Sequence, residues 1–113
     1  MSAADVLGAL SDRARNGRMH VIDQFEIDDA PSTMAAASFL AQVATSRYIL
    51  VVLSREDELS YKSLRNLPSV HVIPADQLNA YDVLHAEDLV FTAAAMASFV
   101  ESAVVVSDVI EEA

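Results

Sequence analysis

The pattern of hydrophobic and polar residues has helical spacing in some stretches and is typical of short strands in others. This succession predicts helices and strands that follow one another along the chain. Residues 2–16, and a stretch that begins at Ser32 or Thr33, carry apolar side chains at helical spacing. Four short stretches that read as strands lie between or after these helices, at residues 19–23, 48–53, 70–73 and 89–91. The run 48–53 is almost entirely apolar, which is typical of a strand buried on both faces of a parallel sheet.

Capping residues mark where the predicted helices begin and end. Gly17 follows the first helical stretch and is a natural stop signal. Ser54, with Asp57 three residues later, forms a capping-box pattern that predicts a helix from this point to about residue 66. Asn79 is expected to cap a short helix that reaches residue 85, and Thr92 is expected to cap the last helix.

Strands that alternate with helices predict right-handed crossovers, and hence a parallel sheet with helices on both faces. The 113 residues suffice for one core, so we expect a single domain over residues 1–113. The segment 103–110 contains three consecutive valines and is expected to be a frayed helix end or a mobile tail from about residue 104. The predicted core comprises Leu10, Phe39, Leu40, Ile49, Val51, Leu64, Val72, Leu84 and Val90.

Composition narrows the class of protein. The hydrophobic content of 53% favours a packed globule. No apolar run reaches the roughly 20 residues that a membrane-spanning helix needs, and no secretory signal pattern is visible at the N-terminus. The absence of cysteine excludes a disulfide framework, a thiolate zinc site and a cysteine nucleophile within this sequence.

Residues that would support catalysis, a cofactor or a metal do not form recognised patterns. The two glycines, Gly8 and Gly17, do not form a phosphate-binding loop, so we expect no nucleotide cofactor and no small-molecule substrate. The histidines at 20, 71 and 85 lack the spacing of metal ligands and are expected to lie at edges or on the surface. Asp82 and Asp88 are expected to cap or solvate turns. The sequence therefore predicts no catalytic residue, no metal site and no enzymatic activity.

The formal net charge of -10 is unevenly distributed along the chain. Residues 1–18 are slightly positive and the C-terminal end is acidic. Two clusters of polar and basic residues are the candidates for contact with RNA phosphates: Arg13, Arg15 and Arg18, and more weakly Lys62, Arg65 and Asn66. Pairing of the first cluster with Asp12 or with helix-end carbonyls is an equally good interpretation.

Five motifs resemble one known family. They are GALSDRARNGR from Gly8, RNLP from Arg65, DQLN from Asp76, YDVL from Tyr81 and LVFT from Leu89. In this order they are similar to the C-terminal part of bacterial large-subunit ribosomal protein four, here the L-four family, in its actinobacterial branch. The resemblance implies a three-layer α/β/α fold whose four-stranded parallel sheet has the fourth strand between the first and second. It also implies ribosomal RNA as partner, on ribosomes in the cytoplasm.

The resemblance runs from about residue 4 to residue 100 and departs from the family in two respects. The family's N-terminal strand and its long, basic, glycine-rich loop, which carry much of its RNA contact, have no counterpart in this sequence. Leu7, Met34 and Ala93 stand where the resemblance leads us to expect basic residues. Apolar residues there would enlarge the hydrophobic surface, so we interpret the chain as a domain trimmed and resurfaced, by engineering or by divergence.

The sequence is compatible with two functions. The first is a ribosomal-protein-like domain that binds ribosomal RNA, weakly because the acidic surface repels a polyanion. The second is a protein-interaction or scaffold module on the same fold, present as a homo-oligomer or bound to a protein partner. The candidate interface residues for the second function are Met34, Ala93, Met96, Ala97 and Val100.

Overall fold

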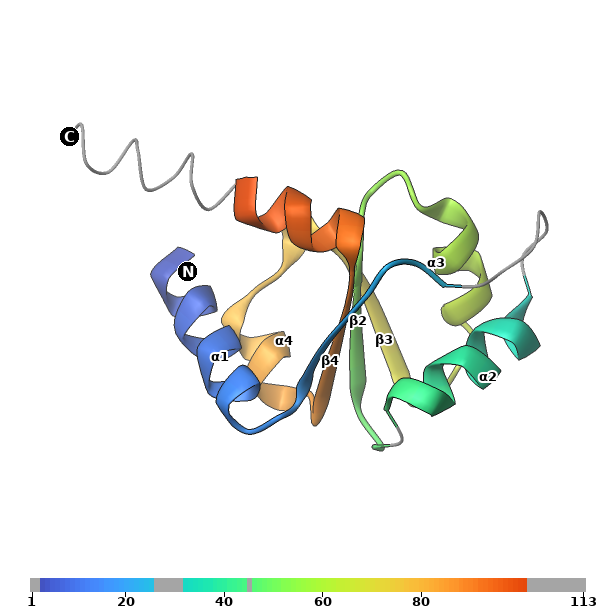
Figure 1. Cartoon of the computed structure of the whole chain (residues 1–113), viewed down its shortest axis with the longest axis horizontal. Helices are drawn as coiled ribbons and strands as arrows, with labels where there is room; N and C mark the ends of the chain where they lie inside the picture. The colour runs from blue at the N-terminus through green and yellow to red at the C-terminus, as the bar shows by residue number, and fades with distance from the viewer. Residues whose placement is uncertain (1–2, 26–31, 45, 102–113) are drawn as a thin grey trace.

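The computed structural model describes residues 3–25, 32–44 and 46–101 of the chain. Helices and strands alternate along the chain (Figure 1), with these bounds: α1 Ala3–Arg15, β1 Met19–Ile22, α2 Thr33–Val43, β2 Ile49–Leu53, α3 Glu58–Leu64, β3 Val70–Pro74, the 3-10 turn η1 Ala75–Gln77, α4 Ala80–His85 and β4 Asp88–Thr92. A last helix follows and is described over residues 93–101. The ambiguous segment 103–110 lies outside the described residues.

The four strands form one parallel sheet in the order β1-β4-β2-β3. Strand β4 therefore lies between β1 and β2, as the resemblance implied. Met19 pairs with Leu89, and Ile49 pairs with both Asp88 and Val70. All five positions of β2 are buried, which confirms the prediction from the apolar run 48–53. All five positions of β4 are buried as well.

Helices cover both faces of the sheet, so the predicted three-layer α/β/α architecture is confirmed (Figure 1). One core cluster contains Leu50, Leu89 and Phe91 from the sheet and side chains of α1, α4 and the last helix. The second cluster lies on the opposite face, with Val51 and Val90 packed against α2 and α3. The alternation of side chains along each strand divides the core in this way.

The predicted caps Asn79 and Thr92 are confirmed, and Ser32, one of the two residues at which the second helix was expected to begin, caps α2. Ser32 accepts a hydrogen bond from the backbone N–H of residue 35, Asn79 from that of residue 82, and Thr92 from that of residue 95. Gly17 ends the turn after α1 with a φ of 71°, a left-handed conformation that glycine adopts without strain. The prediction for Ser54 was wrong, because Asp57 caps α3 instead.

The cap of α3 differs because residues 54–57 form a turn before the helix begins. The backbone N–H of Asp57 donates to the carbonyl of Ser54 over 3.0 Å. The Asp57 side chain then accepts from the N–H of Ser60 over 3.2 Å. Aspartate is as good an N-cap as serine, so the second residue of the capping-box pattern caps the helix.

The predicted core is confirmed except at Leu84. Leu10, Leu40, Ile49, Val51, Leu64 and Val90 are buried, and Phe39 and Val72 are half-buried against the second cluster. Leu84 is 49% exposed, whereas its neighbour Val83 is fully buried. Adjacent positions on a helix point about 100° apart, and α4, with six residues, presents Val83 to the sheet.

Candidate nucleic-acid interface

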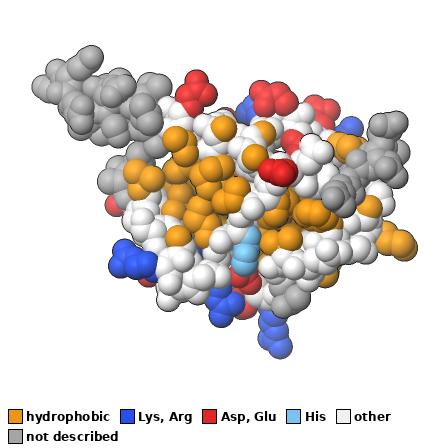
Figure 2. Space-filling model, viewed as in Figure 1, with side chains coloured by type: hydrophobic (Ala, Val, Ile, Leu, Met, Phe, Trp, Pro, Cys, Tyr) orange, Lys and Arg blue, Asp and Glu red, His pale blue; other side chains and the backbone are white. Residues whose placement is uncertain are grey.

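Five of the seven basic residues lie near the edge of the sheet at which all four strands begin. Each helix between parallel strands runs back across the sheet, so helix C-termini and the loops before strands meet at that edge. Arg13 and Arg15 occupy the last turn of α1, Arg18 precedes β1, Arg47 precedes β2 and Arg65 follows α3. We call this set of five the arginine edge. Basic side chains line the lower edge of the molecule in Figure 2.

Arg13 is half-buried and is tied to the end of α4. Its Nη2 donates a hydrogen bond of 2.7 Å to the carbonyl oxygen of Leu84. The last carbonyls of a helix lack partners within the helix and carry partial negative charge, so a guanidinium satisfies both needs. Its buried Nε has no hydrogen-bond partner among the described residues. Arg13 therefore joins two helices of the same layer and has fewer donors free for a phosphate.

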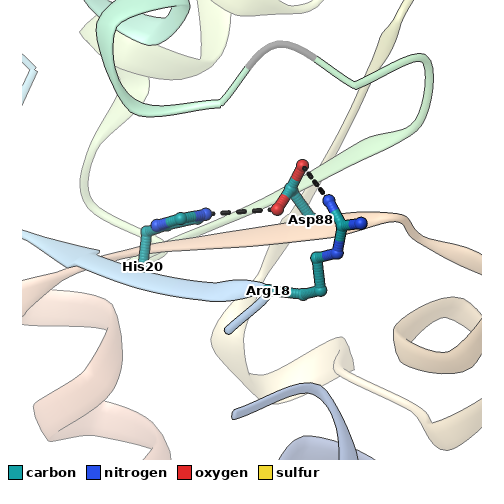
Figure 3. A network of polar contacts seen from close by, with 3 residues as sticks. All are labelled: Arg18, His20 and Asp88. Carbon is teal, nitrogen blue, oxygen red and sulfur yellow. Dashed lines mark hydrogen bonds and ion pairs between the residues drawn. The ribbon is translucent and has the colours of Figure 1, made fainter. Parts of the chain in front are cut away.

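Arg18 and His20 approach the buried carboxylate of Asp88 from two sides (Figure 3). His20 Nε2 lies 3.2 Å from Asp88 Oδ1, and Arg18 Nη1 lies 3.9 Å from Oδ2. The Asp88 side chain is 7% exposed, whereas that of Arg18 is 54% exposed. The expectation that Asp88 caps or solvates a turn was wrong, because the strands on both sides of β4 bury its first residue. Arg18 keeps much of its guanidinium open to solvent.

The remaining members of the arginine edge are exposed. Arg15, Arg47 and Arg65 have no ion-pair partner within the described part of the chain. Lys62, in the last turn of α3, and Asn66, next to Arg65, are also exposed and flank this edge. Sequence reasoning did not single out Arg47. The signal for it is topological: a loop that precedes a parallel strand reaches the same edge as the other such loops.

Acidic side chains gather at the opposite edge, where the strands end. Asp23 follows β1, and Glu56, Asp57 and Glu58 follow β2. Arg55 also lies there, and its guanidinium binds the Asp76 carboxylate over 2.7 Å. No group of three or more His, Cys, Asp or Glu among the described residues is arranged to hold a metal ion. Among the described residues, these carboxylates lie away from the arginine edge, whereas Asp12, Asp82, Glu87 and Asp88 lie at or close to it.

The residues predicted to form a protein interface lie on both layers. Ala93, Ala97 and Val100 are exposed on the last helix, and Met96 of the same helix is partly buried against the first core cluster. Met34 is 80% exposed on α2, which packs on the opposite face of the sheet. The structure therefore brings together the residues of the last helix but does not bring Met34 to them. None of the helices in the described ranges is both long and apolar enough to cross a membrane.

Comparison with known proteins confirms the resemblance that the sequence motifs suggested. Residues 3–102 match the model of the Ribosomal protein L4/L1 family. The chain is 56% identical over 100 residues to the large ribosomal subunit protein uL4 of Leifsonia xyli subsp. xyli, an alignment that covers 88% of this chain and 45% of that protein. The uL4 protein of Corynebacterium urealyticum is 53% identical over 103 residues, covering 91% of this chain and 46% of its own length. The chain spans about half the length of the curated relatives it matches.

Proposed function

The chain belongs to the ribosomal protein L4/L1 family, and on that premise we propose that it is a constituent of the large ribosomal subunit that binds ribosomal RNA through the arginine edge. The relatives are named as proteins of the large ribosomal subunit. A place on the ribosome, in the cytoplasm, follows from the same proposal. The function is structural, and no chemical step is assigned to any residue.

The observation that carries the proposal is the unequal distribution of basic residues between the two edges of the sheet. Five arginines lie near the edge where the strands begin, and the buried carboxylate of Asp88 there is accompanied by Arg18 and His20. Glu56, Asp57 and Glu58 lie at the edge where the strands end. A local positive surface attracts a polyanion even when the net charge is negative, because screening limits interactions to about 8 Å at physiological salt. Guanidinium groups also match the geometry of phosphate oxygens.

The arginines differ in what they offer to RNA. Arg15, Arg47 and Arg65 present exposed guanidiniums and are assigned as the main phosphate contacts. Arg18 adds a contact while it remains near Asp88. Arg13 orients α1 against α4 and contributes through its charge. Lys62 and Asn66 extend the surface along the end of α3. We expect the affinity to be modest, since the chain as a whole carries a charge of -10.

Retention of large-subunit ribosomal RNA on filters across a series of salt concentrations tests the proposal. The logarithm of the binding constant is expected to fall linearly with the logarithm of the salt concentration. Replacing Arg15, Arg47 and Arg65 together by alanine is expected to weaken binding and to reduce that slope by about one unit for each phosphate that is no longer neutralised.

Arg47→Ala and Arg55→Ala form a matched pair of controls. Each removes one exposed arginine, and therefore the same charge, but from opposite edges of the sheet. We expect Arg47→Ala to lower the salt slope and Arg55→Ala to leave it unchanged. Equal effects of the two variants, or no retention of RNA by the parent chain at low salt, would contradict the proposal.

A further inference from the structure

A hollow of about 320 Å³ opens at the beginning of β2 and β3, beside the arginine edge. Tyr48, His71, Asp82 and His85 line it, together with apolar side chains at the start of the two strands. We call this hollow the ring pocket. Its volume is at the lower end of the range of about 300–1,000 Å³ that small-ligand pockets span, so it has room for one small group.

Two aromatic rings, those of Tyr48 and His85, line the ring pocket, and Tyr81 stacks on His85 outside the lining. The ring centroid of His85 lies 5.1 Å from that of Tyr48 and 6.0 Å from that of Tyr81. The His85 and Tyr81 rings are almost parallel, with an interplanar angle of 3°. Tyr48 is 54% exposed and Tyr81 is 70% exposed. Large ring surfaces are thus available to a planar group that enters from solvent.

Hydrogen bonds fix the backbone segments that carry these rings. The carbonyl of Tyr48 accepts hydrogen bonds from the N–H of Glu87 over 2.8 Å and from that of Asp88 over 3.2 Å. Tyr81 and His85 are one helical turn apart on α4, whose first turn is capped by Asn79. A site whose groups are already in position costs less conformational entropy on binding.

The charged groups in and around the ring pocket favour different positions for the base and the phosphate of a nucleotide. Asp82 is half-buried in the pocket, and its Oδ2 accepts a hydrogen bond of 2.7 Å from Asn79 Nδ2. A carboxylate repels phosphate but accepts hydrogen bonds from the amino groups of bases. Arg47 directly precedes Tyr48, and Arg13 binds the carbonyl of the residue before His85. Phosphates are therefore favoured beside the pocket, and a base is favoured inside it.

We propose that the ring pocket takes one unpaired nucleobase of the bound RNA, stacked on the ring of Tyr48 beside His85, while adjacent phosphates lie on the arginine edge. This proposal rests on the proposed function. Proteins recognise unpaired RNA bases by stacking them on aromatic side chains and by hydrogen bonds to their edges. The preference for an unpaired base follows from access, because a base inside a duplex cannot present its face to a tyrosine ring.

Ultraviolet cross-linking of the chain to large-subunit ribosomal RNA, followed by mass spectrometry of the digested complex, tests the contact directly. A nucleotide adduct is expected on the peptide that contains Tyr48 or His85. Adducts confined to other peptides, in a complex that forms at low salt, would overturn the ring pocket and leave the arginine edge standing.

Affinity measurements with Tyr48→Leu provide the second readout. Stacking of one base on an aromatic ring is worth enough that we expect a loss of affinity of about 5- to 100-fold. The salt slope should not change, because the substitution removes no charge. Tyr48→Phe keeps the ring and is expected to bind like the parent. Tyr61→Leu is the matched control, since Tyr61 is 45% exposed on α3 and does not line the ring pocket.

The outcomes separate the two proposals. Parental affinity of Tyr48→Leu for RNA overturns the ring pocket alone. A loss of affinity in Tyr61→Leu as large as that in Tyr48→Leu also overturns it, because the effect would then not depend on the pocket. No binding by the parent chain overturns the proposed function, and the ring pocket with it. Thermal melting that matches the parent shows that each variant is folded.

Discussion

Asp88 occupies the first position of β4, where strands on both sides shield its carboxylate from water. The carboxylate is 7% exposed and is accompanied by His20 at 3.2 Å and by Arg18 at 3.9 Å. A buried charge without a partner is costly, so these two side chains make an aspartate acceptable at this position. The same contacts fix Arg18 at the arginine edge.

Replacing Asp88 by alanine is expected to lower the free energy of unfolding by about 1–3 kcal/mol. The change removes the acceptor of His20 and the nearby anion of Arg18, and it leaves unfilled space in a buried strand. Urea denaturation at pH 7 measures the difference. Asp76→Ala is the control, because its pair with Arg55 is exposed and such pairs contribute about 0–1 kcal/mol. An equal or larger loss for Asp76→Ala would contradict the assignment.

Helix α3 shows how neighbouring residues compete to begin an element. Ser54 and Asp57 are both residue types that cap helices, but the helix has only seven residues, from Glu58 to Leu64. The turn at residues 54–57 takes the chain away from the end of β2 before the helix starts. Asp57 then caps the helix. Leu64 at the end of this helix is buried, and Arg65, the next residue, belongs to the arginine edge.

Asp57→Ala and Ser54→Ala distinguish the two caps. Loss of an N-cap costs about 0.5–2 kcal/mol, so Asp57→Ala should lower the free energy of unfolding by that amount. Ser54→Ala should change it much less, because the Ser54 contact in this turn is made by its backbone carbonyl. Both values come from urea denaturation. The reverse order of the two variants would show that Ser54 begins the helix.

At the scale of the whole molecule, the two layers present different surfaces. The layer with α1, α4 and the last helix carries the ring pocket and an exposed stripe of Ala93, Ala97 and Val100. The other layer carries Met34. The stripe follows the spacing i, i+4 and i+7, so its members lie on one side of the last helix. Self-association through this stripe stays a prediction.

Analytical ultracentrifugation of the parent chain is expected to show a homo-oligomer that the variant Ala93→Lys/Ala97→Lys converts to a monomer. The lysines would place charge on the stripe and oppose burial of this surface against a second copy. Ser98→Lys is the control, since Ser98 is exposed on the same helix but off the stripe. A parent chain that sediments as a monomer at high concentration argues against association.

The sequence by itself determined the order and type of the elements, the fold class and the family. Periodicity of apolar residues, caps such as Asn79 and Thr92, and the uninterrupted run of β2 depend on residues close together in the chain. Such local preferences act before the tertiary structure forms and survive in it. Sequence reasoning failed at Leu84, because the local pattern does not fix which side of a short helix faces the sheet. Leu84 faces solvent, and its neighbour Val83 is buried.

Only the tertiary structure decided which side chains meet. The contact between His20 and Asp88 spans 68 positions of the sequence, and that between Arg13 and Leu84 spans 71. Crossovers of the parallel sheet bring Arg47 beside the other arginines, and they place Met34 on the layer opposite the last helix. Strand order and packing set these distances, and no spacing pattern along the chain encodes them. The arginine edge and the ring pocket are therefore properties of the fold.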